Sequence, residues 1–214
     1  MPAIKAILFD FGKVLTLAPN QDVWARIQQL TGLPEPLLQE RYWGMRDDYD
    51  EGLLTGDVYW ESIAGRLLTR ADLEKLQAAD VDLWTDMNTP MLEWVGALHA
   101  AGFRTGILSN MPDAMADGIC SRFDWVARFD HTIWSHALKL RKPQPEIYLR
   151  AIEGLHTPPE NILFIDDKAE NIAAAETAGM QTVLYSDHDA FVREMNSRGL
   201  GVLLTPSKAL LPAL

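Results

Sequence analysis

The chain has 214 residues, 48% of them hydrophobic and 23% charged, with a formal net charge of −11 at pH 7. A globular chain of this length can bury one sizeable core together with a small accessory domain. The acidic balance argues against nucleic acid and anionic membranes as partners, and no apolar run approaches the roughly 20 residues that cross a bilayer.

The first predicted element is a buried strand over residues 4–9, an apolar run that leads directly into the carboxylate of Asp10. After Gly12 the chain is expected to turn and to leave the sheet by about Thr16. A short apolar strand that ends in an acid is typical of a parallel sheet. Ligands bind at the carboxyl edge of such sheets, so this edge is where we expect the chemistry.

Residues 19–84 have a helical pattern throughout, with no predicted strand. The expected helices are a first one that ends at Gly32 and three more, over residues 34–49, 56–68 (with Thr55 as N-cap) and 71–79. We therefore predict an inserted helical cap subdomain over residues 17–85.

Four of the seven tryptophans belong to this region, namely Trp24, Trp43, Trp60 and Trp84. They are expected to pack in the core of a small helical bundle. The alternative is that one or two of them line a pocket that faces the sheet edge.

From residue 90 onward, predicted helices and strands alternate. The expected helices cover residues 90–102, 113–122, 145–154, 170–178 and 189–198. The expected strands cover residues 104–108, 132–134, 162–165 and 182–185. This alternation predicts an α/β fold with a doubly wound parallel, Rossmann-like sheet, formed by residues 1–16 and 86–214.

Polar side chains with complementary chemistry follow the predicted strands. They are Asp10, Ser109 with Asn110, the lone Lys142 before a proline, and the pair Asp166-Asp167. The carboxyl ends of parallel strands meet at one edge of a sheet. Three carboxylates, a hydroxyl, an amide and an ammonium at that edge suggest a Mg²⁺-assisted phosphate site.

Four segments carry a family resemblance. They are Phe9-Asp10-Phe11-Gly12-Lys13-Val14-Leu15, then Ser109-Asn110, then Arg141-Lys142-Pro143-Gln144-Pro145-Glu146-Ile147-Tyr148, and finally Asp166-Asp167 with Asn171, Ala175 and Gly179. In this order they resemble the motifs of the haloacid dehalogenase superfamily. The resemblance covers nearly the whole chain, including the helical cap inserted after the first strand.

The chemistry of a carboxylate makes Asp10 the candidate nucleophile, which would form a covalent aspartyl intermediate. The resemblance implies that Asp10 and Asp167 bind Mg²⁺ directly, that the carbonyl of Gly12 is a backbone ligand, and that Asp166 lies in the outer shell.

The same resemblance implies that Ser109 and Lys142 hold the oxygens of the transferring phosphoryl group. Asn110, Phe11 and Gly12 are further candidates for phosphate binding. Lys142 would also balance the charge of the carboxylates.

Gly12 departs from the pattern of the similar phosphatases, which usually carry there an aspartate that protonates the leaving group. A positioned general acid contributes typically about 10²–10⁴-fold to the rate. Phosphates with good leaving groups are therefore expected to be the easier substrates. A substitute acid could come from the charge run over residues 46–51, although this run is expected to be a solvated helix end. Lys13 is equally consistent with substrate binding and with a position in solvent.

The expected function is a Mg²⁺-dependent phosphatase of a small phosphorylated metabolite, and the similarity to sugar-1-phosphate phosphatases makes a sugar phosphate one candidate. The second interpretation is a 2-haloacid dehalogenase, in which Arg41 or Arg46 would bind a substrate carboxylate. The third is a binding or regulatory protein that has lost turnover. The sequence does not separate a phosphatase from a phosphotransferase, or a monomer from a homodimer. The single cysteine, Cys120, excludes an internal disulfide and fits a cytoplasmic protein.

Overall fold

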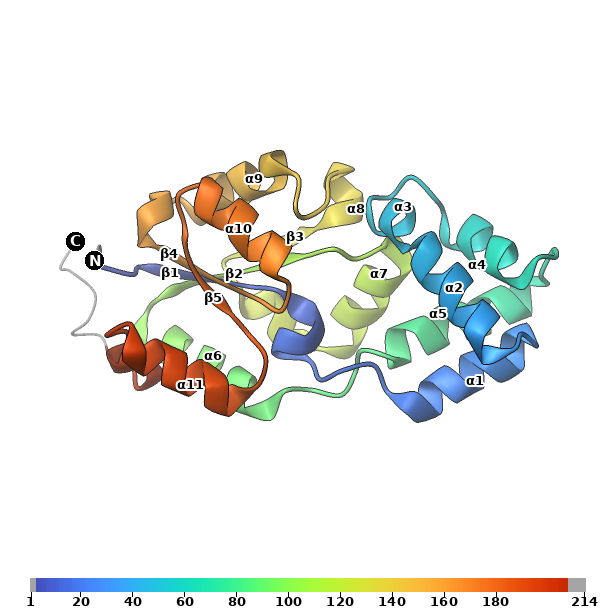
Figure 1. The fold of residues 1–214 in the computed structure, drawn as a ribbon, viewed down its shortest axis with the longest axis horizontal. Coiled ribbons are helices and arrows are strands. Elements are labelled where there is room, and N and C mark those ends of the chain that lie inside the picture. Colours follow the sequence, from blue (N-terminus) through green and yellow to red (C-terminus); the bar gives the residue numbers. More distant parts are fainter. Residues whose placement is uncertain (1–2, 208–214) are drawn as a thin grey trace.

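Five parallel strands form the central sheet of the computed structural model, which describes residues 3–207 (Figure 1). They are β1 (Ala6–Phe9), β2 (Arg104–Ser109), β3 (His131–Trp134), β4 (Ile162–Asp166) and β5 (Gln181–Leu184). Their order is β3-β2-β1-β4-β5, so the first strand of the chain lies at the centre of the sheet. The predicted α/β fold with a doubly wound parallel sheet is confirmed.

Helices cover both faces of this sheet, as the upper and lower layers of Figure 1 show. The covering helices are α6 (Thr89–Ala101) and α11 (His188–Ser197) on one face, and α9 (Pro145–Leu155) and α10 (Ala169–Thr177) on the other. Successive side chains of a strand point to opposite faces. Accordingly Ile7 and Phe9 of β1 join the first cluster and Ala6 and Leu8 the second, and all four are fully buried.

The carboxyl ends of the three central strands are level with one another. Phe9, the last residue of β1, pairs with Ile107 of β2 and with Ile165 of β4. The residues that follow these strand ends, beginning with Asp10, therefore meet at one edge of the sheet.

A second group of helices lies beyond this edge, at the right of Figure 1. It comprises α1 (Gln21–Thr31), α2 (Glu35–Gly44), α3 (Arg46–Asp50), α4 (Gly56–Ala64) and α5 (Arg70–Asp82). These helices share an aromatic core of their own, in which Tyr42, Tyr59 and Trp60 are fully buried. They are the helices expected of a cap, while its boundaries at residues 17 and 85 stay a prediction. Within residues 3–207, no helix has the length and apolar character needed to cross a membrane.

Two linkers connect the helical group to the sheet and run antiparallel to each other. Thr16 forms an isolated β-bridge with Met87, and the backbone N–H of Leu17 donates to the carbonyl of Asp86 over 2.7 Å. The helical group is thus an insertion between β1 and α6 that is held at its base by paired backbone.

The single helix predicted over residues 34–49 is wrong, because the chain breaks at Met45 into α2 and α3. Met45 has φ −115° and ψ 5°, outside the helical region, and it follows Gly44, a poor helix former. The break matters for the site, because Arg46 and Asp50 of the short helix α3 are both buried.

The next two predicted helices differ from the structure at their ends. The helix predicted over residues 56–68 stops at Ala64, because Gly65 adopts φ 68° and ends it with a left-handed cap. Its predicted N-cap is confirmed, since the side chain of Thr55 accepts a hydrogen bond from the N–H of Val58. The fourth helix, predicted over residues 71–79, is longer at both ends.

Several short elements were not predicted, because they are too brief to show a periodicity. They are a π-type turn (Phe11–Leu15), the helix α8 (Ser135–Leu138) and short 3₁₀ turns at Asp124–Arg128, Pro159–Asn161 and Gly201–Leu204.

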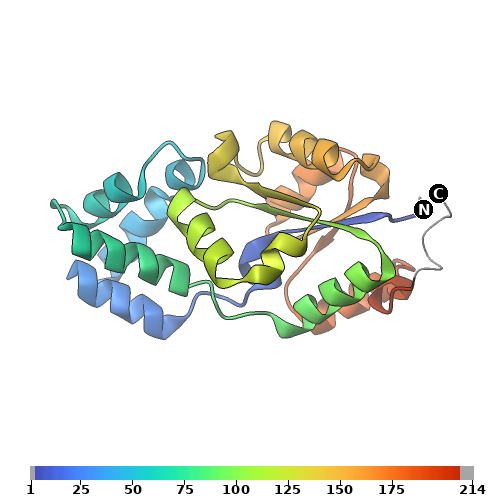
Figure 2. The same ribbon diagram turned by 180° about the vertical axis from the view of Figure 1, so that it is seen from behind.

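Substitution of Gly118 tests the close contact between α5 of the helical group and α7, which follows β2. Gly118 belongs to α7 (Asp113–Arg122), which packs against α5 in the middle of Figure 2. A Cβ atom here would lie 2.4 Å from Cγ2 of Val81, a β-branched side chain with little rotamer freedom. We expect Gly118→Ala to lower the free energy of unfolding by about 1–3 kcal/mol in urea denaturation.

The matched control is Gly96→Ala in α6, an exposed helical position where an added Cβ meets no atom within 4 Å. This substitution should raise the free energy of unfolding by about 0.5–1 kcal/mol. Equal effects at the two positions would contradict the tight α5–α7 contact.

Candidate active site

Three carboxylates converge at the carboxyl edge of the sheet. Asp10 follows β1, Asp166 ends β4, and Asp167 comes next; one oxygen of each lies within 4.8 Å of the others. Asp10 is 8% exposed and Asp166 is fully buried. Such a set of carboxylate oxygens suits Mg²⁺, and close like charges out of water need a cation to offset their repulsion.

Lys142 supplies one positive charge to this cluster. Its Nζ lies 2.8 Å from Oδ1 of Asp10 and 2.7 Å from Oδ2 of Asp166, and the residue is only 2% exposed. Burial lowers the pKa of Lys142, but the two carboxylates outweigh it and hold the pKa above its usual value. Lys142 is therefore a permanently charged ammonium between the two aspartates.

Asn110 fixes the backbone that carries this lysine. Its Nδ2 donates to the carbonyl of Lys142 over 3.0 Å, and its Oδ1 accepts from the N–H of Lys142 over 2.8 Å. Through these two hydrogen bonds Asn110 positions Lys142, while phosphate binding by Asn110 itself stays a prediction.

Asp166 is occupied by protein groups on both oxygens. Oδ2 faces Lys142, while Oδ1 accepts from the N–H of Lys168 over 2.8 Å and from Nδ2 of Asn171 over 2.9 Å. Asp167 instead has a single described ion pair, at 3.1 Å from the half-exposed Lys13. This arrangement leaves Asp167 the more accessible of the two for a cation.

The carboxyl group of Asp10 is held through one of its oxygens. Oδ1 accepts from the N–H of Phe11 over 2.7 Å and contacts Lys142. The pKa of Asp10 is raised to about 7, because burial, together with the charges of Asp166 and Asp167, outweighs the opposing effect of Lys142. A bound divalent cation would favour the ionised carboxylate, which is the form that can act as a nucleophile.

A cavity of about 260 Å³ opens between the sheet edge and the helical group. Every site residue predicted from the sequence lines it, except the fully buried Asp166: these are Asp10, Phe11, Gly12, Ser109, Asn110, Lys142 and Asp167. Lys13, which the sequence left between substrate and solvent, lines it too. The structure thus brings together residues from opposite ends of the chain.

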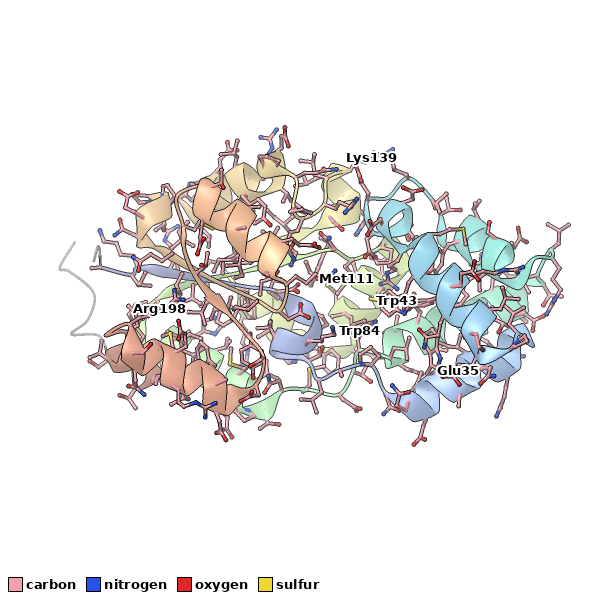
Figure 3. All side chains as sticks on the ribbon, in the orientation of Figure 1. Glu35, Trp43, Trp84, Met111, Lys139 and Arg198 are labelled. Carbon is pink, nitrogen blue, oxygen red and sulfur yellow. The ribbon has the colours of Figure 1, made fainter. Side chains whose placement is uncertain are left out.

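The four tryptophans of the helical region divide between the two roles that were considered. Trp24 and Trp60 are buried in the aromatic core of the helical group. Trp43 and Trp84 line the cavity, and Figure 3 shows both close to Met111 between the sheet and the helices. The sequence does not reveal Met111 and Met115 as cavity residues, because a single methionine that lines a cavity cannot be distinguished in sequence from one that packs in a hydrophobic core.

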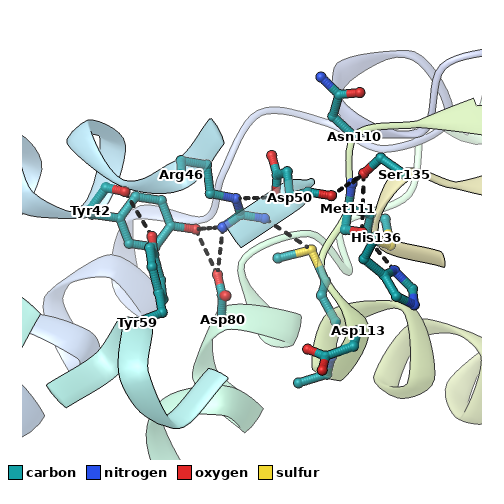
Figure 4. A network of polar contacts seen from close by, with 12 residues as sticks. Tyr42, Arg46, Asp50, Tyr59, Asp80, Asn110, Met111, Asp113, Ser135 and His136 are labelled. Atoms are coloured by element: carbon teal, nitrogen blue, oxygen red, sulfur yellow. Dashed lines mark hydrogen bonds and ion pairs between the residues drawn. The ribbon is translucent and has the colours of Figure 1, made fainter. Parts of the chain in front are cut away.

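A buried polar network closes the far side of the cavity (Figure 4). Nε of Arg46 lies 2.6 Å from Oδ1 of Asp50, and Nη1 lies 2.5 Å from the hydroxyl of Tyr42 and 3.3 Å from Oδ1 of Asp80. Its Nη2 contacts the sulfur of Met115. All three nitrogens of the guanidinium are therefore held by the protein.

The prediction that residues 46–51 form a solvated helix end is wrong for Arg46 and Asp50, which are 6% and 8% exposed and line the cavity. The carbonyl of Asp50 also accepts a hydrogen bond from the hydroxyl of Ser135, which ties α3 to the sheet domain (Figure 4). Burial raises the pKa of Asp50 to about 6, although Arg46 opposes this shift.

The sequence model of the haloacid dehalogenase-like hydrolases matches residues 4–179. Bifunctional epoxide hydrolase 2 of Sus scrofa is 27% identical over 225 residues, which cover 96% of this chain and 40% of that protein. The chain spans less than half the length of the first curated relatives that it matches.

Two solved structures show the same fold. A HAD family enzyme from Bacteroides thetaiotaomicron, in complex with magnesium and inorganic phosphate, has a TM-score of 0.71 and 24% identity over 86% of this chain and 94% of that one. The L-2-haloacid dehalogenase from Xanthobacter autotrophicus has a TM-score of 0.65 and 20% identity over 94% of this chain and 86% of that one.

Removal of the buried ammonium should destabilise the protein strongly. Lys142→Met leaves Asp10 and Asp166 without their shared counter-charge, so we expect the free energy of unfolding to fall by about 3–5 kcal/mol in metal-free buffer. The control, Lys75→Met, breaks an exposed pair with Asp72 and should change it by less than about 1 kcal/mol. Comparable effects of the two variants in urea denaturation would show that the carboxylates do not depend on Lys142.

The burial of Asp50 predicts a pH-dependent difference between the wild type and Asp50→Asn. The raised pKa of Asp50, beside Arg46, Asp80 and Lys168, means that the folded state takes up the proton more readily than the unfolded state. Its contribution to stability is therefore present at low pH and lost as the pH rises through about 6.

From about pH 5 to about pH 7.5, the free energy of unfolding of the wild type should fall relative to that of Asp50→Asn by about 1 kcal/mol. Urea denaturation of both proteins at the two pH values measures this change. A difference that stays constant with pH would contradict the burial of the carboxyl group.

Proposed function

The chain belongs to the haloacid dehalogenase-like hydrolases, and within that family we propose that it is a Mg²⁺-dependent phosphatase of a small phosphorylated metabolite. The observation that carries the proposal is the set of three carboxylates with a single buried counter-charge, Lys142. The complex of a structurally similar enzyme with magnesium and inorganic phosphate supports it.

In the proposed reaction, a carboxylate oxygen of Asp10 attacks phosphorus. The bond between phosphorus and the ester oxygen breaks, and the leaving group departs with the electron pair and later takes a proton from water. Water then attacks the phosphorus of the aspartyl phosphate, which releases inorganic phosphate and regenerates Asp10. When bound, Mg²⁺ would neutralise charge as an anion approaches the phosphate dianion.

The remaining residues of the site would bind the cation and the phosphoryl group. Asp10, Asp167 and the carbonyl of Gly12 would hold the cation, with Asp166 behind them because its oxygens are already bonded. Lys142 and Ser109 would bind the phosphoryl oxygens, since both line the cavity beside Asp10.

The contacts of Arg41 and Arg46, the two candidates for binding a substrate carboxylate in a dehalogenase, disfavour the dehalogenase interpretation. Nη1 of Arg41 donates to the carbonyl of Ile63 over 2.7 Å, and Arg41 is not among the residues that line the cavity. Arg46 lines the cavity, but Asp50 and Asp80 already neutralise it. Neither guanidinium is therefore poised to bind a substrate carboxylate.

The wider setting of the enzyme is also a proposal. We take residues 17–85 as the cap and residues 1–16 with 86–214 as the catalytic core. Cys120, which is exposed and unpaired, is consistent with a reducing cytoplasm, and the enzyme would act as a monomer or a homodimer.

Asp10→Asn should abolish phosphate release, because a carboxamide cannot form the aspartyl phosphate. We would measure inorganic phosphate from a panel of phosphorylated metabolites that includes acetyl phosphate, with Mg²⁺ and with EDTA. The exposed control Asp22→Asn should release phosphate at the wild-type rate. EDTA should abolish phosphate release by both the wild type and this control.

Turnover that survives in Asp10→Asn would contradict the proposed nucleophile. If no compound in the panel releases phosphate while 2-chloropropionate releases chloride, the enzyme is a dehalogenase. A protein that does neither is a binding or regulatory member of the fold.

A further inference from the structure

The indole of Trp84 fills the space beside Gly12. A Cβ atom built at Gly12 would lie 3.0 Å from Cζ3 and 3.4 Å from Cε3 of Trp84. Gly12 has φ −66° and ψ 130°, a conformation that any residue adopts. The backbone would therefore accept a side chain here, and the indole is what leaves little room for one at the position where similar phosphatases carry their proton donor.

Trp84 is well placed for this role because it joins the two halves of the molecule. It follows α5 at the base of the helical group and packs against both the aromatic core of that group and the core on one sheet face. Its Nε1 is buried and has no hydrogen-bond partner among residues 3–207. Packing alone thus holds the ring, and its six-membered edge lies against Gly12.

The wall around Trp84 is apolar. Phe11, Trp43, Met111 and Met115 line the cavity with it, and Trp43 remains 47% exposed although it is a large aromatic residue. Binding sites are commonly lined by such side chains with a few polar groups at one end. A cavity of roughly 150 Å³ holds benzene, so a cavity of about 260 Å³ has room for an aromatic ring beside a phosphoryl group at Asp10.

We propose that the cavity takes aryl phosphates, monoesters of phenol-like alcohols, and that Trp84 determines this specificity. The inference rests on the proposed phosphatase function. Gly12 carries no general acid, and Asp50 on the far wall is bonded to Arg46, so the ester oxygen leaves as an anion when Asp10 attacks phosphorus. A phenol, with a pKa of about 10 like that of tyrosine, leaves as phenolate and takes its proton from water afterwards.

The apolar wall and the missing acid both favour aryl phosphates as substrates. An aromatic ring buries its faces against this apolar wall, whereas sugar hydroxyl groups placed against Phe11, Met111 and Met115 would lose hydrogen bonds to water. The polar residues of the far wall, Arg46 and Asp50, are bonded to each other. Lys13, Lys168 and Asn171 also line the cavity, so the apolar wall favours an aryl group over a sugar only where the substrate lies against that wall.

Phenyl phosphate and cyclohexyl phosphate are the decisive pair, because they match in size and differ in leaving group and flatness. We expect phenyl phosphate to exceed cyclohexyl phosphate in kcat/KM by at least about 10²-fold, the lower bound of what a positioned acid contributes. Acetyl phosphate, with a good leaving group and no ring, serves as the internal reference for each enzyme variant.

Trp84→Leu separates the role of the ring from that of the leaving group. It should raise KM for phenyl phosphate about three- to tenfold more than it raises KM for acetyl phosphate. Trp84→Phe keeps an aromatic face and leaves no acceptor unpaired, since Nε1 has no described partner, so it should restore most of the affinity. A purely structural role of Trp84 would affect both substrates alike.

Several outcomes would overturn the inference. Equal turnover of the phenyl and cyclohexyl esters, or hydrolysis of acetyl phosphate but of neither ester, would reject aryl phosphates while the proposed phosphatase stands. An unchanged KM for phenyl phosphate in Trp84→Leu would reject the role of Trp84. Absence of Mg²⁺-dependent hydrolysis with all three compounds would remove the phosphatase function itself.

Discussion

The repulsion among Asp10, Asp166 and Asp167 is the constraint on which the rest of the structure depends. Parallel pairing makes the ends of β1 and β4 level, and this register brings the carboxylates within 4.8 Å of one another. In a partly buried site such charges cannot remain uncompensated. Lys142 neutralises part of the charge from within the protein, and the remainder makes the edge a site for a cation and a phosphate.

Some residues around the carboxylates bond to them or to Lys142, while other carboxylate oxygens stay available for ligands. Asn110 fixes the backbone of Lys142, and Asn171 and the N–H of Lys168 hold Asp166. Asp167 and one oxygen of Asp10 remain for ligands. The same division appears across the cavity, where Asp50 and Asp80 neutralise Arg46, so that the helical group presents an apolar wall with no free charge from this arginine.

The sequence alone predicted the sheet, the helical insertion and the residues at the sheet edge, because these depend on local patterns. An apolar run into Asp10 and another into Asp166 suffice to predict two strand ends, and parallel strands bring such ends together. The burial of Arg46 and Asp50 was not predictable in this way, since a charge run has the same pattern in solvent. The contact of Trp84 with Gly12 joins residues far apart in the chain, and only the packing of the helical group against the sheet reveals it.

Acid-quenched turnover with ³²P-labelled acetyl phosphate and Mg²⁺, followed by peptide mapping, tests the central claim most directly. The phosphatase mechanism predicts an acid-stable, hydroxylamine-sensitive label on the peptide that contains Asp10, and no label in Asp10→Asn. A label on another residue, or release of phosphate with no labelled intermediate at any quench time, would contradict Asp10 as the nucleophile of this site.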